Sequence, residues 1–194
     1  MRKNIFLITA IAILLVISGS AAAQSTKTGI RIGLNMADIS SENVISTKKL
    51  TGITAGAFVT FNVGPLKIQP ELLYSQKGAK LKIYDSSGII IVDEDLKLSY
   101  IEIPLLVKYD ISSINTSIFA GPSFSYLIGA KAGDEDIEDS LKESDTGIVI
   151  GAGIDLSTKL SIDGRYTLSL NDCADNYALD LKNSVITVNL GIIL

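Results

Sequence analysis

Residues 159–170 read KLSIDGRYTLSL, and this stretch decides the fold because its side chains alternate in character with a period of two. Successive side chains of a β-strand point to opposite faces of the sheet. One face of this strand carries Leu160, Ile162, Tyr166, Leu168 and Leu170, and the other carries Ser161, Asp163, Arg165, Thr167 and Ser169. The strand therefore separates an apolar environment from a polar one.

The same alternation recurs along the chain after residue 25. It predicts strands near 27–36, 51–63, 65–78, 96–110, 113–128, 145–156, 159–170 and 183–194. Short connections at 62–65, 110–113 and 156–159 alternate with long, acidic ones at 37–50, 79–95, 129–144 and 171–182. This is the pattern of an all-β, eight-stranded antiparallel up-and-down transmembrane β-barrel, with short periplasmic turns and long extracellular loops.

The apolar rows of the predicted strands carry no charge. They comprise Ile30, Ile32, Leu34 and Met36; Ile53, Ala55, Ala57, Val59 and Phe61; Ile114, Ile118, Ala120 and Phe124; Ile148, Ile150, Ala152 and Ile154; and Ile186, Val188, Leu190, Ile192 and Leu194. A Lys or Arg on the lipid face costs about 2–4 kcal/mol at the bilayer midplane, so these rows are expected to face lipid. The fourth strand is an exception, because Leu98, Glu102 and Pro104 share a phase, and a bulge near Pro104 would explain the break.

The opposite rows mix small residues with charges. The interior of an eight-stranded barrel is just wide enough for side chains to fill, and buried ions are tolerated when they are paired. We therefore expect a structural polar network in the lumen, in which Glu71 and Glu102 pair with Arg165 and Arg31. The predicted network residues are Arg31, Glu71, Glu102, Asp163 and Arg165. A proton path or a narrow pore is the functional alternative.

The first residues of the chain have the pattern of an export signal. Arg2 and Lys3 precede an apolar stretch at 5–17, and three alanines at 21–23 suit a signal peptidase. We expect a cleaved signal peptide at 1–23 and a barrel domain at 24–194. The barrel domain then has 15 basic and 21 acidic residues, a formal charge of −6, which argues against a nucleic-acid partner.

Four motifs lie on the predicted strands: GLN at 33–35, QPELLYSQKG at 69–78, YIEIPLLVKY at 100–109 and FAGP at 119–122. Together they resemble the PorT-type outer membrane β-barrel domain family of Gram-negative bacteria, over essentially all of residues 24–194. The resemblance implies an integral outer-membrane barrel of eight strands, and for PorT itself a role in protein export. It also implies outer-membrane lipid, lipopolysaccharide, the barrel assembly machinery and other envelope proteins as partners. The chain departs from common outer-membrane barrels by ending in Leu194 in place of Phe or Trp.

Enzymatic chemistry finds little support in the sequence. The chain has no histidine, which removes histidine acid–base catalysis, Ser-His-Asp triads and most zinc chemistry. The single cysteine, Cys173, lies beside Asp172 and Asp175, whose charges disfavour a thiolate. We expect no catalytic residues, no cofactor and no bound metal, with a carboxylate-only or Ser-Lys mechanism as the remaining enzymatic alternative. The acidic run at 134–139 is a solvated loop in this interpretation, and a divalent-cation site in the alternative.

These observations predict a non-enzymatic outer-membrane protein with a filled lumen and a structural or protein-interaction role. Two other functions stay open. By analogy with PorT, the protein would belong to an export apparatus and act through protein contacts. As a soluble lipocalin-like barrel it would carry a small ligand, which requires apolar side chains inside and polar ones outside.

Overall fold

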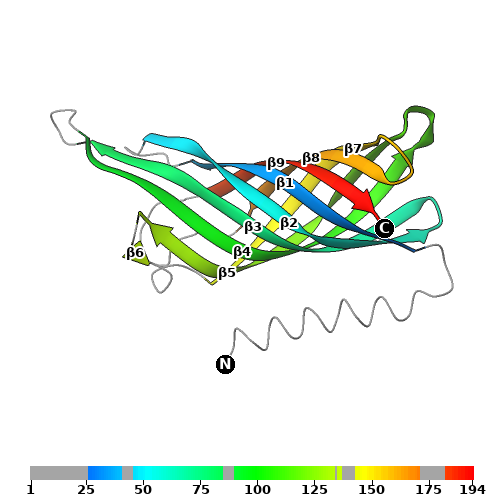
Figure 1. The fold of residues 1–194 in the computed structure, drawn as a ribbon, viewed down its shortest axis with the longest axis horizontal. Helices are drawn as coiled ribbons and strands as arrows, with labels where there is room; N and C mark the ends of the chain where they lie inside the picture. Colours follow the sequence, from blue (N-terminus) through cyan, green and yellow to red (C-terminus); the bar gives the residue numbers. More distant parts are fainter. Residues whose placement is uncertain (1–25, 41–45, 85–89, 134, 137–142, 171–181) are drawn as a thin grey trace, which may run out of the picture.

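The chain folds into one closed barrel of antiparallel strands (Figure 1). The structure, a computed structural model, describes residues 26–40, 46–84, 90–133, 135–136, 143–170 and 182–194. The predicted signal peptide and most of the acidic run at 134–139 lie outside these ranges. The strands are β1 (Lys27–Ser40), β2 (Ser46–Val63), β3 (Leu66–Tyr84), β4 (Ile90–Ile111), β5 (Thr116–Ala132), β6 (Glu135–Asp136), β7 (Ser144–Asp155), β8 (Leu160–Ser169) and β9 (Lys182–Ile193).

The helical content of the described ranges is small, and none of their helices is long and apolar enough to cross a membrane.

Each long strand pairs with its neighbour in sequence, and the first pairs with the last. The order is β4-β3-β2-β1-β9-β8-β7-β5, and pairing of β4 with β5 closes the sheet. The two-residue β6 pairs only with the end of β5, at Lys131 and Ala132. Gly29 of β1 lies opposite Ile193 of β9, and the Leu194 N–H donates to the Thr28 carbonyl at 2.9 Å. Closure leaves no long strand with an unpaired edge, which a bilayer requires of a β-protein.

The prediction of an eight-stranded antiparallel barrel is confirmed. The three short connections are Gly64–Pro65, a 3-10 turn η1 (Ser112–Ile114) followed by Asn115, and residues 156–159. Gly64 and Asn115 have positive φ, at 63° and 50°; glycine and asparagine tolerate that conformation best. As expected, these turns lie at the same end of the barrel as the ends of β1 and β9 that carry Gly29 and Ile193.

The predicted long loops at 37–50 and 79–95 are shorter than expected. Strand pairing continues through Ser40 and from Ser46 in the first, and through Tyr84 and from Ile90 in the second. The physical reason is that the hydrogen bonds between paired strands do not depend on an apolar face, so antiparallel strands can continue beyond the membrane. The alternation itself continues into the second extension, where Leu81 and Ile83 alternate with Lys80 and Lys82, so the prediction ended this strand too early.

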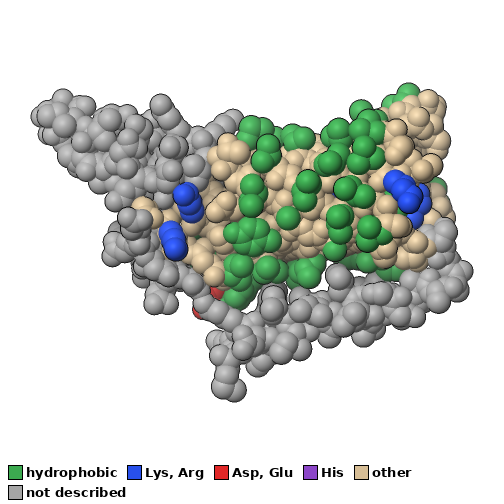
Figure 2. Space-filling model, in the orientation of Figure 1, with side chains coloured by type: hydrophobic (Ala, Val, Ile, Leu, Met, Phe, Trp, Pro, Cys, Tyr) green, Lys and Arg blue, Asp and Glu red, His purple; other side chains and the backbone are tan. Residues whose placement is uncertain are grey.

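The outer face of the barrel is apolar. Ile32, Ile150 and Ile154 are each more than half exposed, and the other large apolar members of their rows are at least 39% exposed. Figure 2 shows hydrophobic side chains in a band across the middle of the barrel, with Lys and Arg side chains toward both ends. Soluble monomers rarely expose apolar patches this extended. Val59 shares the outward phase but is only 6% exposed, so it does not belong to the exposed row.

The fourth strand has no bulge at Pro104, contrary to expectation. Its alternation is regular there, and Leu98, Glu102 and Pro104 all point inward. The register shift between β4 and β5 falls at Ser99 and Tyr100 instead. The apolar row that seemed out of phase therefore fills the lumen, and the outward row of β4 is formed by Leu105, Val107 and Tyr109.

Candidate functional site

The lumen is the place where charged side chains gather. The five charged residues predicted to face it are buried, at 2% exposure for Arg31, 0% for Glu71, 6% for Glu102, 3% for Asp163 and 6% for Arg165. They reach the lumen from four strands, because each lies in the inward phase of its strand. The structure divides them into two groups.

The first group is an ionic quartet of Arg31, Glu71, Asp163 and Arg165. Arg31 Nη1 lies 2.8 Å from Glu71 Oε1, and its Nη2 lies 3.1 Å from Asp163 Oδ2. Arg165 Nη1 lies 2.9 Å from Glu71 Oε2, and its Nε lies 3.0 Å from Asp163 Oδ1. Each cation therefore contacts both anions, and the quartet has no net charge.

Neutral side chains complete the coordination of the two carboxylates. Gln69 Nε2 donates to Glu71 Oε1 at 2.6 Å, and Asn189 Nδ2 donates to Asp163 Oδ1 at 3.0 Å. Thr60 Oγ1 donates in turn to Gln69 Oε1 at 3.0 Å. Buried ions are costly unless they are paired and hydrogen-bonded, and both conditions hold here.

Two phenylalanines lie against the two guanidinium groups. Arg31 Cζ lies 5.1 Å from the centroid of the Phe58 ring, and Arg165 Cζ lies 5.4 Å from that of Phe119. Each ring sits over a glycine directly across the ladder, Gly29 for Phe58 and Gly151 for Phe119. A Cβ on Gly29 would lie 2.3 Å from Phe58 Cζ, and one on Gly151 would lie 2.5 Å from Phe119 Cζ. The glycines therefore provide the space in which ring and cation stack.

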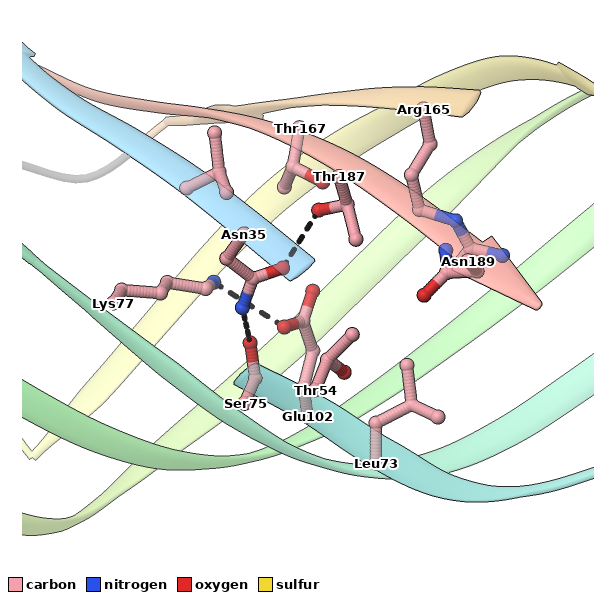
Figure 3. Close-up of a pocket in the computed structure, with 11 residues that line it drawn as sticks. Asn35, Thr54, Leu73, Ser75, Lys77, Glu102, Arg165, Thr167, Thr187 and Asn189 are labelled. Atoms are coloured by element: carbon pink, nitrogen blue, oxygen red, sulfur yellow. Dashed lines mark hydrogen bonds and ion pairs between the residues drawn. The ribbon is translucent and has the colours of Figure 1, made fainter. Parts of the chain in front are cut away.

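The second group surrounds Glu102. Lys77 Nζ lies 3.3 Å from Glu102 Oε2, and Ser123 Oγ donates to Glu102 Oε1 at 2.9 Å. Figure 3 shows this pair beside Asn35, which donates to Ser75 at 3.0 Å and accepts from Thr187 at 2.9 Å. These side chains border a cavity of about 10 Å³, room for about one water molecule.

Apolar side chains fill other parts of the lumen. One cluster contains Leu106, Phe119 and Val149, and another contains Leu98, Tyr100, Leu127 and Ala130. Leu106 and Val149 are fully buried. The described part of the lumen is therefore packed with side chains, as the width of an eight-stranded barrel leads one to expect.

The pairing within the lumen differs from the expectation in one respect. Glu71 contacts both arginines, whereas Glu102 is paired with Lys77 and not with an arginine. The reason is that Lys77, four residues beyond the direct partner of Glu102 on the neighbouring strand β3, reaches the carboxylate with its long side chain. Sequence reasoning missed Lys77, although it shares the phase of Glu71 on β3, and it missed Gln69, Asn35 and Asn189.

No group of three or more Asp, Glu or Cys side chains that could hold a metal ion occurs within the described ranges. Glu135 and Asp136 of the acidic run form β6, and the predictions for the rest of the run and for Cys173 lie outside the described ranges. The charges of the quartet neutralise one another, as do those of Lys77 and Glu102.

Comparisons with known proteins agree with this architecture. A family model described as outer membrane protein beta-barrel domain matches residues 22–175. The fold is similar to the crystal structure of Neisserial surface protein A, with 13% identity, a TM-score of 0.57 and coverage of 85% of this chain and 96% of that one. It is also similar to Ail, the attachment invasion locus protein of Yersinia pestis, in complex with the heparin analogue sucrose octasulfate. Identity there is 17%, the TM-score is 0.50, and coverage is 87% and 99%. No curated protein matches the sequence.

Proposed function

This chain belongs to the outer membrane protein beta-barrel domain family, and on that premise we propose that it is a non-enzymatic, non-conducting barrel that acts through the part of its sheet outside the membrane. The observation that carries the proposal is the ionic quartet, whose four buried side chains occupy the lumen. A barrel closed in this way offers no path for solutes. Its contacts with other molecules then lie at its two ends.

The end with the long connections offers the larger surface. The ladder between β3 and β4 runs from Leu66 opposite Tyr109 to Tyr84 opposite Ile90, and these strands reach farthest from the short turns (Figure 1). We therefore place the interaction surface on the extended hairpin of β3 and β4, facing the outside of the cell.

Several residues of the motifs that resemble PorT-type proteins have structural roles in the lumen. Gln69 and Glu71 belong to the quartet and its hydrogen bonds, and Glu102 belongs to the pair with Lys77. These motif residues therefore fill the lumen, which is a structural role and does not by itself indicate export. An export role would be exerted at the periplasmic end, and it is kept as the second candidate because the motifs resemble that family.

The soluble-carrier alternative has the opposite distribution of side chains. It requires an apolar interior, whereas the interior here holds charges and the exterior is apolar.

We also propose that residues 1–23 are the export signal. N-terminal sequencing of the protein purified from outer membranes should begin at Gln24, and an intact Met1 would contradict the proposed cleavage.

Cross-linking in intact cells tests the interaction role. A photoreactive amino acid replaces Lys97, exposed on β4 toward the long connections, or Lys159, exposed in a short turn. The proposal predicts protein adducts from position 97 and none from position 159. Adducts from position 159 alone would favour a periplasmic partner and the export role, and adducts from neither position would contradict an interaction role.

A further inference from the structure

A second cavity lies at the end of the barrel that carries the short turns. Its volume is about 40 Å³, enough for a few water molecules or one halide ion. The charged residues that line it are Lys27, Arg31, Lys67, Lys108, Asp110 and Asp155. The quartet lies on one side of this mouth cavity, because Arg31 belongs to both.

Two donors at the mouth cavity, the Arg31 Nε–H and the Lys108 ammonium, have no hydrogen-bond acceptor within the described ranges. Arg31 is 2% exposed, its two Nη atoms bind Glu71 and Asp163, and its buried Nε has no acceptor in the part of the chain that the structure describes. Lys108 Nζ lies 5.5 Å from the centroid of the Phe119 ring, and within the described ranges no carboxylate pairs with it. The Arg31 Nε–H is a buried donor without an acceptor, which is costly, and Lys108 is half-buried. A ligand that accepts from these two groups would therefore be stabilised.

The charges at the mouth cavity are also unbalanced. Lys67 is paired with Asp110, and the guanidinium of Arg31 is neutralised by the quartet. Two cations, Lys27 and Lys108, and one anion, Asp155, then remain. Lys27 and Asp155 are exposed, and Lys108 is half-buried. One positive charge is left over at a site partly shielded from solvent, where electrostatic attraction is stronger than in bulk water.

We propose that the mouth cavity binds one small inorganic anion, of the size of chloride, through the Nε–H of Arg31 and the ammonium of Lys108. The anion supplies the missing acceptor and removes the excess positive charge in one step. Its site is reached from the periplasmic end and is independent of any surface at the other end. Neutral water in the same space is the competing occupant.

Chlorine-35 NMR of the refolded barrel in a zwitterionic detergent tests the proposal. A chloride titration should give saturable line broadening. The Lys108→Met variant should weaken binding at least about tenfold, since it removes a charged hydrogen-bond donor. The matched control is Lys159→Met, which removes the same charge from an exposed turn at the same end and should retain the affinity within about twofold. An absence of saturable broadening, or equal losses in both variants, would overturn the proposal.

A second variant covers the case in which Lys108→Met does not fold. Ser117 is buried and lines the mouth cavity, so Ser117→Asp places a carboxylate where the anion would lie. The folded variant, identified by its heat-modifiable electrophoretic mobility, should lose the saturable broadening. Unchanged chloride affinity in Ser117→Asp would overturn the proposal as well.

Discussion

Arg165 and Glu71 are 94 positions apart in sequence, and Arg165 Nη1 lies 2.9 Å from Glu71 Oε2. Their strands, β8 and β3, are separated in the sheet by β2, β1 and β9. This ion pair therefore crosses the lumen and connects opposite walls of the barrel. Its energetic role can be measured, because each partner also has a second partner in the quartet.

Glu71→Gln should strongly destabilise the barrel. The change removes one of two anions and leaves two buried guanidinium groups facing Asp163 alone, and breaking a buried ion pair in this way costs about 3–5 kcal/mol. Urea unfolding in phospholipid vesicles, followed by circular dichroism, measures the loss. Glu143→Gln is the control, because Glu143 is exposed and surface changes usually stay within about 0.5 kcal/mol.

Arg165→Met should partly rescue Glu71→Gln. The double variant leaves Arg31 and Asp163 as a balanced pair, which are in contact at 3.1 Å. The coupling energy from the double-mutant cycle should be about 0.5–3 kcal/mol in favour of the double variant. Lys77→Met combined with Glu71→Gln is the control, since Lys77 is paired with Glu102. Additive losses in both combinations would mean that the quartet does not act as a unit.

Gly151→Val should destabilise the barrel through Phe119. The new Cβ would lie 2.5 Å from Phe119 Cζ and 2.5 Å from the carbonyl oxygen of Gly164. The ring that stacks on Arg165 and the adjacent backbone of β8 therefore both have to move, and overpacking of this kind costs about 1–3 kcal/mol. Gly164→Val is the matched control, because nothing lies within 4 Å of a Cβ built there. Phe119→Ala should reduce the effect of Gly151→Val, as measured by the same urea titration. Equal losses at positions 151 and 164 would contradict the packing shown here.

Ile150→Arg should impair membrane insertion. Ile150 is 53% exposed on the outer face of β7, and an arginine there costs about 2–4 kcal/mol at the midplane but only about 0–1 kcal/mol near the interface. Ile154→Arg, nearer the end of the same strand, should therefore be milder. Refolding yield into vesicles compares the two variants, and a larger defect for Ile154→Arg would place the membrane elsewhere on the barrel.

The part of the fold inside the membrane was predictable from sequence. Alternation such as that of residues 160–170 identifies a strand and tells which face meets lipid, because the two environments differ so strongly in polarity. The strand extensions beyond residues 36 and 78 were not predicted. The alternation of Leu81 and Ile83 with Lys80 and Lys82 carried the signal for the second extension, but charged residues outside the apolar rows were interpreted as part of a loop.

The sequence predicts which residues line the lumen but not which of them form pairs. Phase alone places Arg31, Glu71, Glu102, Asp163 and Arg165 inside, but which side chains meet depends on strand tilt and register around the closed sheet. Glu102 was therefore matched with an arginine, whereas Lys77 on the adjacent strand lies closer. The stacking of Phe58 over Gly29 has no signal in a single strand, since the two residues meet only across the β1–β2 ladder.

Planar-bilayer recording of the purified protein is the most direct test of the central claim, that the quartet closes the lumen of an outer-membrane barrel. The wild-type protein should insert without discrete channel openings at any applied voltage, because its lumen is filled by paired charges and apolar side chains. A large, stable and voltage-independent conductance would contradict the account, since it would mean that an open aqueous path runs through the barrel.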